Sequence, residues 1–465
     1  MTEQALLFDK DLIRRYDRQG PRYTSYPTAV QFSAAFGSAD YRRHAAASNA
    51  VPRPAPLSLY FHIPFCATVC YYCGCNKIVT KNRAHTVQYL DSLFREVERQ
   101  GALFDRSRTV EQLHWGGGTP TFLDAGQMED LMARTAQHFS LRDDDQGEYS
   151  IEIDPRTVDA DKVHFLRRLG FNRLSMGVQD FDPAVQRAVN RIQSEQQTLD
   201  IVSAARAAGF QSLSVDLIYG LPLQTAASFD LTLDKIIGAD PDRVSVFNYA
   251  HLPQMFKTQR QIDEASLPQP EVKLQILQLA IERLTAAGYV YIGMDHFAKP
   301  QDELAVAQRD GKLSRNFQGY ATHGECDIIG LGVSAIGRVG NSYSQNEREI
   351  GPYQERADSG GLAVFRGVEL NADDVLRRAV INQLICHFEL DFGAIENGYA
   401  IDFQRYFAAE LAELSAMQQD GLLQLDGRGV RVLPAGRLLI RNICMVFDHY
   451  LSAGSGEKSR FSKVI

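Results

Sequence analysis

The chain has 465 residues, enough for two or three domains rather than a single small module. Its formal net charge is −8 and it has no long run of Lys or Arg, so electrostatics disfavour a nucleic-acid partner. Hydrophobic residues make up 45% of it and charged residues 23%, as in ordinary soluble globular proteins.

The first residues, MTEQALLFDKDLIRRYD, carry charges throughout and have no apolar core, so they do not fit a secretory signal. No uncharged stretch approaches the ~20 apolar residues that a membrane-spanning helix needs. We therefore expect a cytoplasmic protein without a membrane segment. In that reducing compartment, clustered cysteines are more often metal ligands or catalytic groups than disulfides.

Residues 1–56 predict an irregular N-terminal arm. Its segment GPRYTSYPTAVQF mixes Pro, Gly and aromatic residues without a sustained period. The arm ends in VPRPAP, which indicates an extended linker.

A regular alternation of strands and helices begins at residue 57. Amphipathic helical patterns, such as the one that places Leu90, Leu93 and Val97 on one face, lie between short apolar runs typical of strands. This alternation predicts an α/β fold with a parallel sheet and helical crossovers. The predicted strands span 57–64, 110–118, 148–154, 173–179, 213–220 and 243–250, with a further candidate at 289–297.

Polar residues stand at or just after the ends of these strands, where parallel α/β folds bind ligands. They are His62, Gly116 to Thr119, Glu152, Gln179, Asp216 and Asn248. From about residue 366 the pattern changes to helices with a small hairpin at LLQLDGRGVRVL. We predict three parts: an arm over 1–56, a barrel with substrate-site elements over 57–365, and a mostly helical domain over 366–465.

Four of the seven cysteines follow the first predicted strand within ten positions: Cys66, Cys70, Cys73 and Cys75. A structural zinc site normally shows two ligand pairs separated by a longer stretch, and no second pair is present here. Three thiolates from one C-x3-C-x2-C loop instead fit an iron–sulfur cubane whose fourth iron stays open to a substrate. Cys75, which follows Gly74, is expected to point away from such a cluster.

This cysteine loop, together with GGGTPT at 116–121 after the second strand, resembles the radical S-adenosylmethionine (SAM) superfamily. More narrowly, the chain resembles the oxygen-independent coproporphyrinogen III oxidases from residue 20 to its C-terminus. The segments that carry this resemblance are GPRYTSYPTA, HIPFC, CGCNKIVT, HWGGGTPT, RLSMGVQDF, DLIYGLP, FNYAHLP and RNFQGY. The resemblance implies a partial (β/α)6-type radical SAM barrel with the irregular arm and a mostly helical C-terminal domain.

The resemblance also implies the cofactors, a 4Fe–4S cluster on Cys66, Cys70 and Cys73 and two molecules of SAM. The cluster-bound SAM would contact the positions that match Tyr60, Tyr72, Gly117 and Glu152. The second SAM would contact the positions that match Gly118, Thr119, Gln179, Arg191, Asp216, Ala250 and Ile336. Glycines at 116–118 would let the backbone approach the methionine portion, and Glu152 can accept hydrogen bonds from two ribose hydroxyls. Family members often carry Phe at position 72, so Tyr72 adds a hydroxyl that needs a partner.

The implied reaction is oxidative decarboxylation of two propionates of coproporphyrinogen III to vinyl groups, in haem biosynthesis. Burying carboxylates requires cations, and Arg22 is the first candidate, followed by Lys77. Cys75, Phe317 and Gln318 match family positions near the active site, and Cys75 could relay a hydrogen. The expected partners are the small-molecule substrate and a reductant such as flavodoxin or ferredoxin, and the expected oligomeric state is a monomer.

Three alternatives stay open. The segment IIGLGVSA at 328–335 fits the G-x-G-x-x-A pattern of a dinucleotide site, although no strand-end acid follows it at the right interval. A haem-binding chaperone related to the family would typically have an aromatic residue in place of Cys75 and would lack the GPRYTSYP arm. A zinc-stabilised interaction module on an α/β barrel is the third possibility.

Overall fold

A computed structural model of the chain describes residues 6–452. The chain divides into two compact units. The first unit comprises Met1–Gln31, Gly288–Gly324 and Leu370–Ile465, and the second comprises Phe32–Ala287 and Glu325–Glu369. Each unit is therefore assembled from segments that are far apart in the sequence, and the predicted domain borders at 56/57 and 365/366 remain predictions.

The second unit contains the predicted parallel sheet. Six strands pair in parallel in their chain order, each with the next. They are β1 (Leu57–Ile63), β4 (Thr109–Gly117), β6 (Glu148–Ile153), β7 (Arg173–Gln179), β8 (Ser212–Tyr219) and β9 (Arg243–Asn248). Each lies on one of the six predicted runs, so the prediction of an α/β fold with a parallel sheet is confirmed.

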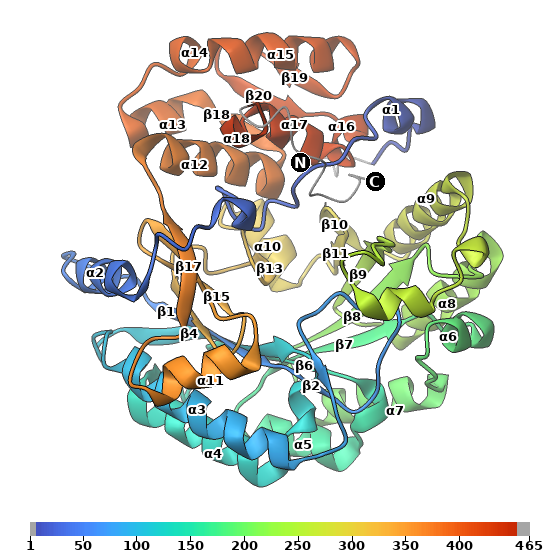
Figure 1. The fold of residues 1–465 in the computed structure, drawn as a ribbon. Helices are drawn as coiled ribbons and strands as arrows, with labels where there is room; N and C mark the ends of the chain where they lie inside the picture. Colours follow the sequence, from blue (N-terminus) through green and yellow to red (C-terminus); the bar gives the residue numbers. More distant parts are fainter. Residues whose placement is uncertain (1–5, 453–465) are drawn as a thin grey trace. The chain divides into compact units, whose positions relative to one another are not determined.

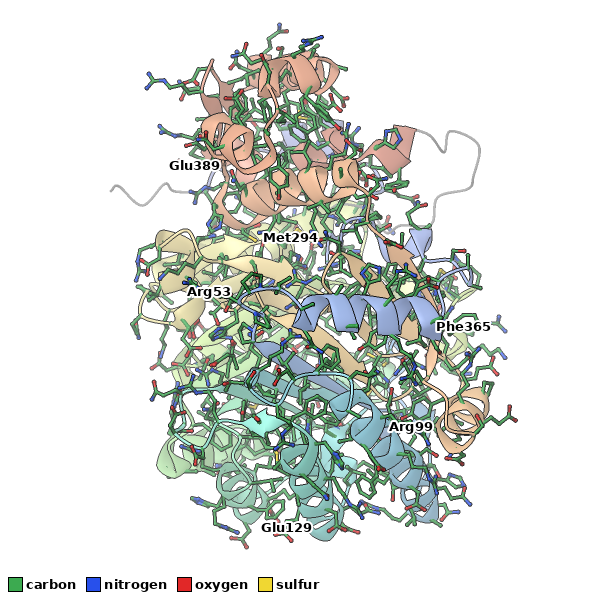
Figure 2. All side chains as sticks on the ribbon, turned by 90° about the vertical axis from the view of Figure 1, so that its left-hand side faces the viewer. Arg53, Arg99, Glu129, Met294, Phe365 and Glu389 are labelled. Atoms are coloured by element: carbon green, nitrogen blue, oxygen red, sulfur yellow. The ribbon has the colours of Figure 1, made fainter. Side chains whose placement is uncertain are left out.

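Helices follow the strands and cover the outer side of this sheet (Figure 1). They are α3 (Ala84–Gly101), α4 (Ala125–His138), α5 (Ala160–Arg168), α7 (Glu195–Ala208), α8 (Ala226–Ala239) and α9 (Pro270–Ala286). Side chains of Asp124, Ser194 and Thr225 cap the first turns of α4, α7 and α8, which fixes where these helices begin. Arg99 on α3 and Glu129 on α4 are labelled in Figure 2.

Beyond β1, the sheet continues with strands from a later part of the chain. Strand β14 (Asp327–Leu331) pairs in parallel with β1, and β15 (Ile336–Val339), β16 (Ser342–Asn346) and β17 (Val364–Glu369) follow in antiparallel order. Strand β1 thus lies between β4 and β14 and is buried at six of its seven positions. The segment that follows β1 begins from a rigid, central position.

The sequence predicted an irregular N-terminal arm, but the structure contains a regular helix within it. Helix α2 (Ser38–Asn49) lies inside it and buries Tyr41 and Ala45, which are four residues apart. The Asp40 side chain accepts a hydrogen bond from the peptide N–H of Gly37, 3.0 Å away, and so closes the first turn. The apolar periodicity of α2 is too weak to announce the helix, since alanine and polar residues make up most of it.

The first unit contains the C-terminal helices, among them α12 (Ala372–His387), α13 (Phe392–Tyr399), α15 (Ala408–Gln419) and α17 (Ile440–Val446). The predicted hairpin is present as β19 (Leu423–Leu425) and β20 (Gly429–Val432), with β18 (Glu389–Asp391) alongside β20. The strand predicted at 289–297 is instead a hairpin of β10 (Val290–Gly293) and β11 (His296–Ala298). It turns at Met294, labelled in Figure 2, whose φ of 56° is left-handed.

Within residues 6–452, the structure has no helix with the length and hydropathy that a membrane crossing requires.

Candidate active site

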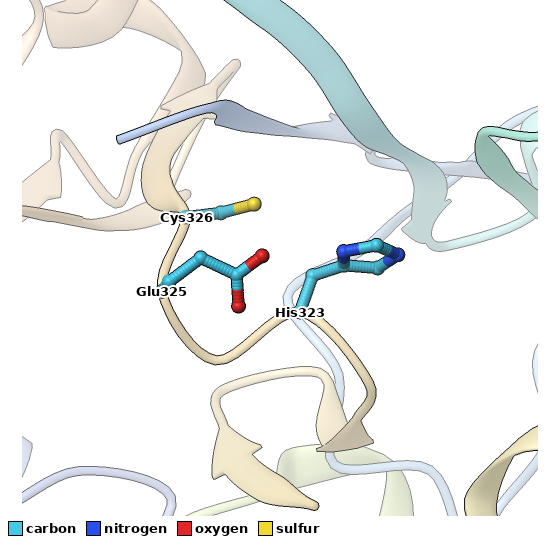
Figure 3. A group of neighbouring side chains, drawn as sticks. All are labelled: His323, Glu325 and Cys326. Atoms are coloured by element: carbon cyan, nitrogen blue, oxygen red, sulfur yellow. The ribbon is translucent and has the colours of Figure 1, made fainter. Parts of the chain in front are cut away.

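The cysteine loop leaves the sheet directly after β1. Cys66 ends the short strand β2 (Phe65–Cys66), which pairs with β3 (Ile78–Val79), so the loop between them is closed at its base. The peptide N–H of Cys73 donates to the carbonyl of Cys70 at 3.2 Å and tightens the loop around the predicted ligands. None of the seven cysteines, all within the described part of the chain, is in a disulfide. Cys326 lies apart from this loop, immediately before β14 and next to Glu325 (Figure 3).

Neighbouring segments of the second unit hold the loop in place. The amide of Asn190 donates to the carbonyl of Val69 at 2.8 Å, and that of Gln259 donates to the carbonyl of Tyr72 at 2.9 Å. The ammonium group of Lys77 donates to the carbonyl of Cys73 at 3.0 Å, so this residue serves the loop itself. Loop position is thus fixed by backbone contacts rather than by the cysteines.

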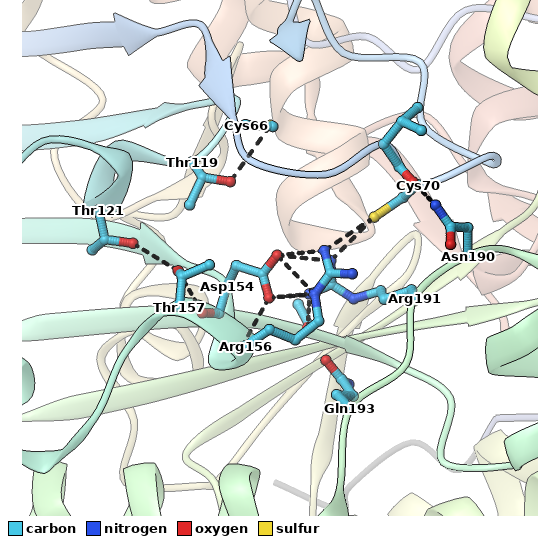
Figure 4. Close-up of polar contacts among 12 residues, drawn as sticks. Cys66, Cys70, Thr119, Thr121, Asp154, Arg156, Thr157, Asn190, Arg191 and Gln193 are labelled. Atoms are coloured by element: carbon cyan, nitrogen blue, oxygen red, sulfur yellow. Dashed lines mark hydrogen bonds and ion pairs between the residues drawn. The ribbon is translucent and has the colours of Figure 1, made fainter. Parts of the chain in front are cut away.

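Positive charge surrounds the thiol of Cys70 (Figure 4). Nη2 of Arg156 lies 3.4 Å and Nη1 of Arg191 lies 3.5 Å from its Sγ, and both guanidinium groups pair with Asp154. The hydroxyl of Tyr72 also hydrogen-bonds to Cys70, which gives that hydroxyl the partner it needed. Donors of this kind stabilise a thiolate, the form in which cysteine binds metal.

The other thiols lie in different surroundings. Sγ of Cys66 is 3.5 Å from the hydroxyl of Thr119. A hydrogen bond from the thiol of Cys75, aided by the charge of Lys77, lowers the pKa of Cys73 to about 6 although burial opposes it. The thiol of Cys75 therefore lies beside that of Cys73, and that Cys75 points away from the bound cluster stays a prediction.

The three glycines of the GGG motif pack so closely against neighbouring protein atoms that no side chain would fit. A Cβ at Gly116 would lie 2.8 Å from the carboxylate of Glu152, and one at Gly118 would lie 2.7 Å from the backbone of Pro64. Gly117 has a φ of 115°, and a Cβ there would meet the ring of His62 at 2.8 Å. The motif therefore brings β4 against the strand end of β1 and against Glu152.

His62 is held in one tautomer. Its Nε2 lies 2.9 Å from the carbonyl of Asn76, which can only accept, so Nε2 carries the proton. Burial lowers the pKa of His62 and favours the neutral ring. Its Nδ1 then accepts from the hydroxyl of Tyr60, 3.1 Å away. The single proton of that hydroxyl is thereby used within the protein.

Glu152 is held by two donors on β4. Nε2 of His114 lies 3.2 Å from its Oε1, and the peptide N–H of Gly117 donates to its Oε2 at 3.1 Å. Partial burial opposes ionisation, but these hydrogen bonds keep the pKa of Glu152 below its usual value. The ring of His114 also stacks on that of Tyr60, with 5.8 Å between centroids, and its Nδ1 is 2.5 Å from the hydroxyl of Ser150.

The strand ends beside this carboxylate present unsatisfied polar atoms. Oε1 of Gln179, Nε of Arg191 and Oδ1 of Asn248 are buried and have no hydrogen-bond partner among residues 6–452. Burial, followed by the charge of Glu152, raises the pKa of Asp216 on β8 to about 7. Gln179 ends β7 and Asn248 ends β9, whereas Asp216 lies within β8 and Arg191 follows helix α6 (Pro183–Ala188). Together these groups suit a polar ligand that would complete their hydrogen bonds.

Comparison with known proteins identifies the family. Residues 60–236 match the radical SAM superfamily, and residues 370–439 match the HemN C-terminal domain. The chain is 56% identical to the oxygen-independent coproporphyrinogen III oxidase of Pseudomonas aeruginosa, over 99% of each chain. It is 50% identical to that of Escherichia coli over the full length of both. The chain belongs to the oxygen-independent coproporphyrinogen III oxidases.

The fold agrees with this membership. A solved structure described as coproporphyrinogen III oxidase (HemN) from Escherichia coli, a radical SAM enzyme, superposes with a TM-score of 0.91. It covers 96% of this chain and 100% of that chain at 50% identity. This oxidase therefore has the radical SAM barrel, and its cofactors are a 4Fe–4S cluster and SAM, as the sequence predicted.

The residues present fit these cofactors. The cysteine loop offers thiols beside guanidinium donors, and the unpaired atoms of Gln179 and Arg191 offer hydrogen bonds to a ligand next to it. Of the predicted SAM contacts, Ala250 lies two residues after the end of β9 and Ile336 begins β15 in the same unit. His114, Asp154 and Arg156 were missed by sequence reasoning because no spacing rule links them to the cysteines.

Three predicted site residues of this oxidase lie in the first unit. Arg22 forms an ion pair with Asp295, so its charge already has a partner. Phe317 and Gln318 form the turn of a hairpin between β12 (Ser314–Asn316) and β13 (Gly319–Ala321).

The G-x-G-x-x-A segment is not a dinucleotide site. Strand β14 turns directly into the antiparallel strand β15, so no βαβ unit opens there. A Cβ at Gly330 would meet the backbone of Ile336 at 2.8 Å, and Gly332, with a φ of 95°, packs on the hydroxyl of Tyr89. These glycines are required by packing.

Proposed function

We propose that this chain converts coproporphyrinogen III to protoporphyrinogen IX by decarboxylating two propionates to vinyl groups without oxygen. The observation that carries the proposal is the cysteine loop beside Glu152. The thiol of Cys70 is flanked by Arg156 and Arg191. In the same unit, His114 and Gly117 hold the carboxylate of Glu152 in one orientation. Both features suit the binding of SAM and its reductive cleavage. The relatives at 50% and 56% identity are named oxygen-independent coproporphyrinogen III oxidases.

Cys66, Cys70 and Cys73 would hold the cluster, and Cys75 would not be a ligand. When bound, the cluster supplies the single electron that cleaves SAM. The guanidinium groups of Arg156 and Arg191 offset the negative charge that thiolates bring into this half-buried loop. The closed base of the loop and its contacts with Asn190 and Gln259 keep the ligands in position without the metal.

The residues around the cluster-bound SAM have distinct roles in this proposal. Glu152, kept ionised by His114 and Gly117, accepts hydrogen bonds from the two ribose hydroxyls. The hydroxyl proton of Tyr60 is donated to His62, so Tyr60 meets the ligand as an acceptor or through its ring. Tyr72 likewise donates to Cys70 and contributes its ring.

A second SAM would bind at the ends of the neighbouring strands. Gln179 and Arg191 would use their unpaired buried atoms on it, and Asp216, with a pKa of about 7, can donate or accept at neutral pH. Gly118, Thr119, Ala250 and Ile336 would complete this site. Two propionate side chains are decarboxylated. If a second SAM is already bound, the enzyme need not release and rebind SAM between the two decarboxylations.

For the substrate itself we propose Arg22, Phe317, Gln318 and Cys75. The carboxylate of Asp295 neutralises the charge of Arg22. Arg22 would therefore contribute the paired N–H donors of its guanidinium group rather than a net positive charge. The thiol of Cys75, which is hydrogen-bonded to Cys73, would lie at the substrate site as a group that can relay a hydrogen. We further propose a flavodoxin or ferredoxin as the reductant, and a monomer that acts in the cytoplasm.

The test is anaerobic incubation of the cluster-loaded protein with coproporphyrinogen III, dithionite and SAM. We expect 5′-deoxyadenosine and a product lighter by two formic acid equivalents, both measured by mass. Tight haem binding without either product would favour the chaperone. Zinc without acid-labile sulfide after anaerobic purification would favour the interaction module, and either result would reject the proposal.

A further inference from the structure

A second arginine of the first unit, Arg315, forms no ion pair with any carboxylate among residues 6–452. Arg315 lies at the centre of β12, in the hairpin whose turn is Phe317 and Gln318. Its guanidinium carbon lies 4.7 Å from the ring centroid of Tyr320, and its Nε donates to the carbonyl of Arg22 at 3.3 Å. Because ring and carbonyl hold it from two sides, the direction of the guanidinium is fixed.

The ring under Arg315 is itself fixed. The hydroxyl of Tyr320 donates to the carbonyl of Ile385 at 3.0 Å, and the side chain is 8% exposed. Gly293 leaves the space for that hydroxyl, since a Cβ there would clash with it. The peptide N–H of Arg315 donates to Oδ1 of Asn382 on α12 at 3.2 Å, which ties the hairpin to this helix.

Two guanidinium groups around this hairpin are incompletely paired. Nη1 of Arg315 and Nη1 of Arg378 are buried and form no hydrogen bond with any residue from 6 to 452. Arg378 lies one helical turn before Asn382 on α12, and residues four apart share a helix face. The neighbouring Arg377, in contrast, pairs with both Asp373 and Glu410.

An arginine cannot shed its charge by deprotonation, so buried Nη1 groups that lack a partner are best satisfied by an anionic acceptor. Nε2 of Gln318, three residues from Arg315, is another buried donor without a partner in the described chain. These three unsatisfied donors, Nη1 of Arg315, Nη1 of Arg378 and Nε2 of Gln318, suit a ligand that has several oxygens and a negative charge. A carboxylate meets both conditions, and a guanidinium fork matches it in shape.

We propose that Arg315, supported by Arg378, binds a propionate carboxylate of the tetrapyrrole that is not decarboxylated or awaits decarboxylation. This inference rests on the proposed function, since it takes the substrate from it. It assigns charge recognition to Arg315 in place of Arg22, whose charge Asp295 already offsets.

The experiment measures binding rather than turnover. Cluster-loaded, full-length protein is titrated anaerobically with coproporphyrin III, the stable aromatic form with the same four propionates. Arg315→Met keeps the alkyl contact with Tyr320 and removes the charge, and we expect it to weaken binding by about tenfold or more. Arg378→Met should weaken binding less, Arg315→Lys should recover part of the loss, and SAM affinity should stay within about twofold.

Arg405, an exposed residue of the same unit, supplies the matched control. Arg405→Met removes one positive charge from the surface and should change porphyrin affinity by less than about twofold. Equal losses in Arg315→Met and Arg405→Met would overturn the inference. If Arg315→Met does not fold, unchanged affinity in both Arg315→Lys and Arg378→Met would reject it. Wild-type protein that does not convert coproporphyrinogen III would instead reject the proposed function.

Discussion

His114 on β4 and Glu152 on β6 are joined by a hydrogen bond of 3.2 Å across neighbouring strands. Since the peptide N–H of Gly117 donates to the other oxygen, both oxygens of this carboxylate are held and its orientation is fixed. His114 is thus expected to position Glu152 without touching the reaction itself.

We expect His114→Ala to lower the SAM affinity of the cluster-loaded protein by about tenfold, the loss of one hydrogen bond to a charged group. Iron content should stay at the wild-type level, because no cysteine ligand contacts His114. His164→Ala, at an exposed position on α5, is the control and should bind SAM normally. Calorimetric titration with SAM measures both, and an unchanged affinity in His114→Ala would remove it from this role.

Gly116→Ala should damage the same site by a steric route. The new Cβ would lie 2.8 Å from the Glu152 carboxylate, which must then leave its hydrogen bonds. We expect at least about a tenfold loss of SAM affinity, with the fold retained. Gly126→Ala in α4 adds the same methyl group where the nearest atom is 3.5 Å away, and it should bind SAM as the wild type does. If Gly116→Ala binds SAM with wild-type affinity, the carboxylate of Glu152 can move without loss of binding, and the steric argument is wrong.

We propose that Cys66, Cys70 and Cys73 are cluster ligands and that Cys75 is not. Cys66→Ser should lose the cluster and all activity, because three thiolates are the minimum that holds a cubane with one open iron. Cys75→Ser should keep iron and sulfide but impair turnover, because in the proposed assignment its thiol lies beside Cys73 and binds no iron. Iron and sulfide analysis with electron paramagnetic resonance measures the outcome. An iron content at the wild-type level in Cys66→Ser, or loss of iron and sulfide in Cys75→Ser, would reverse the assignment of ligand and non-ligand.

Arg22→Ala should raise the KM for coproporphyrinogen III more than it slows SAM cleavage without substrate. The reason is that Arg22 and its partner Asp295 belong to the first unit, while the cysteine loop and Glu152 belong to the second. Steady-state kinetics and 5′-deoxyadenosine formation give the two quantities. Equal kinetics in mutant and wild type would remove Arg22 from the substrate site.

A buried carboxylate of the second unit makes its stability depend on pH. Glu96 on α3 is 2% exposed and accepts hydrogen bonds from Gly332, Asn346 and Tyr353, each at 2.7 Å. Burial raises the pKa of Glu96 from 4.5 to about 6 even so. The folded state therefore holds a proton that the unfolded chain releases. Its contribution to the free energy of unfolding is full below about pH 4.5 and is lost as the pH rises through about 6.

Glu96→Gln removes this titration. The cost of the substitution should be about 2 kcal/mol larger near pH 4 than near pH 7.5, from a pKa shift of about 1.5. Urea denaturation at the two pH values measures the difference, and Glu98→Gln, at an exposed position on the same helix, is the matched control. A pH-independent cost for Glu96→Gln would show that its carboxyl group does not titrate in this range.

The sequence by itself determined the order of the strands, the cysteine loop and the family. These are local features: an apolar run, a helix face or a ligand spacing is written in consecutive residues, and Cys66, Cys70 and Cys73 lie in one loop. It did not reveal α2, whose apolar face is weak, or the turn that splits 289–297 at Met294.

Tertiary structure decided what surrounds those local features. His114 and Glu152 are 38 residues apart and meet only because β4 and β6 pair in a given register. The same holds for Arg156 and Arg191 beside Cys70, for Glu96 under the turn after β14, and for Arg315 on Tyr320. The reason is physical: strand register and packing set the distances between distant residues, and these distances, rather than residue types, decide which charge is paired and which is left for a ligand.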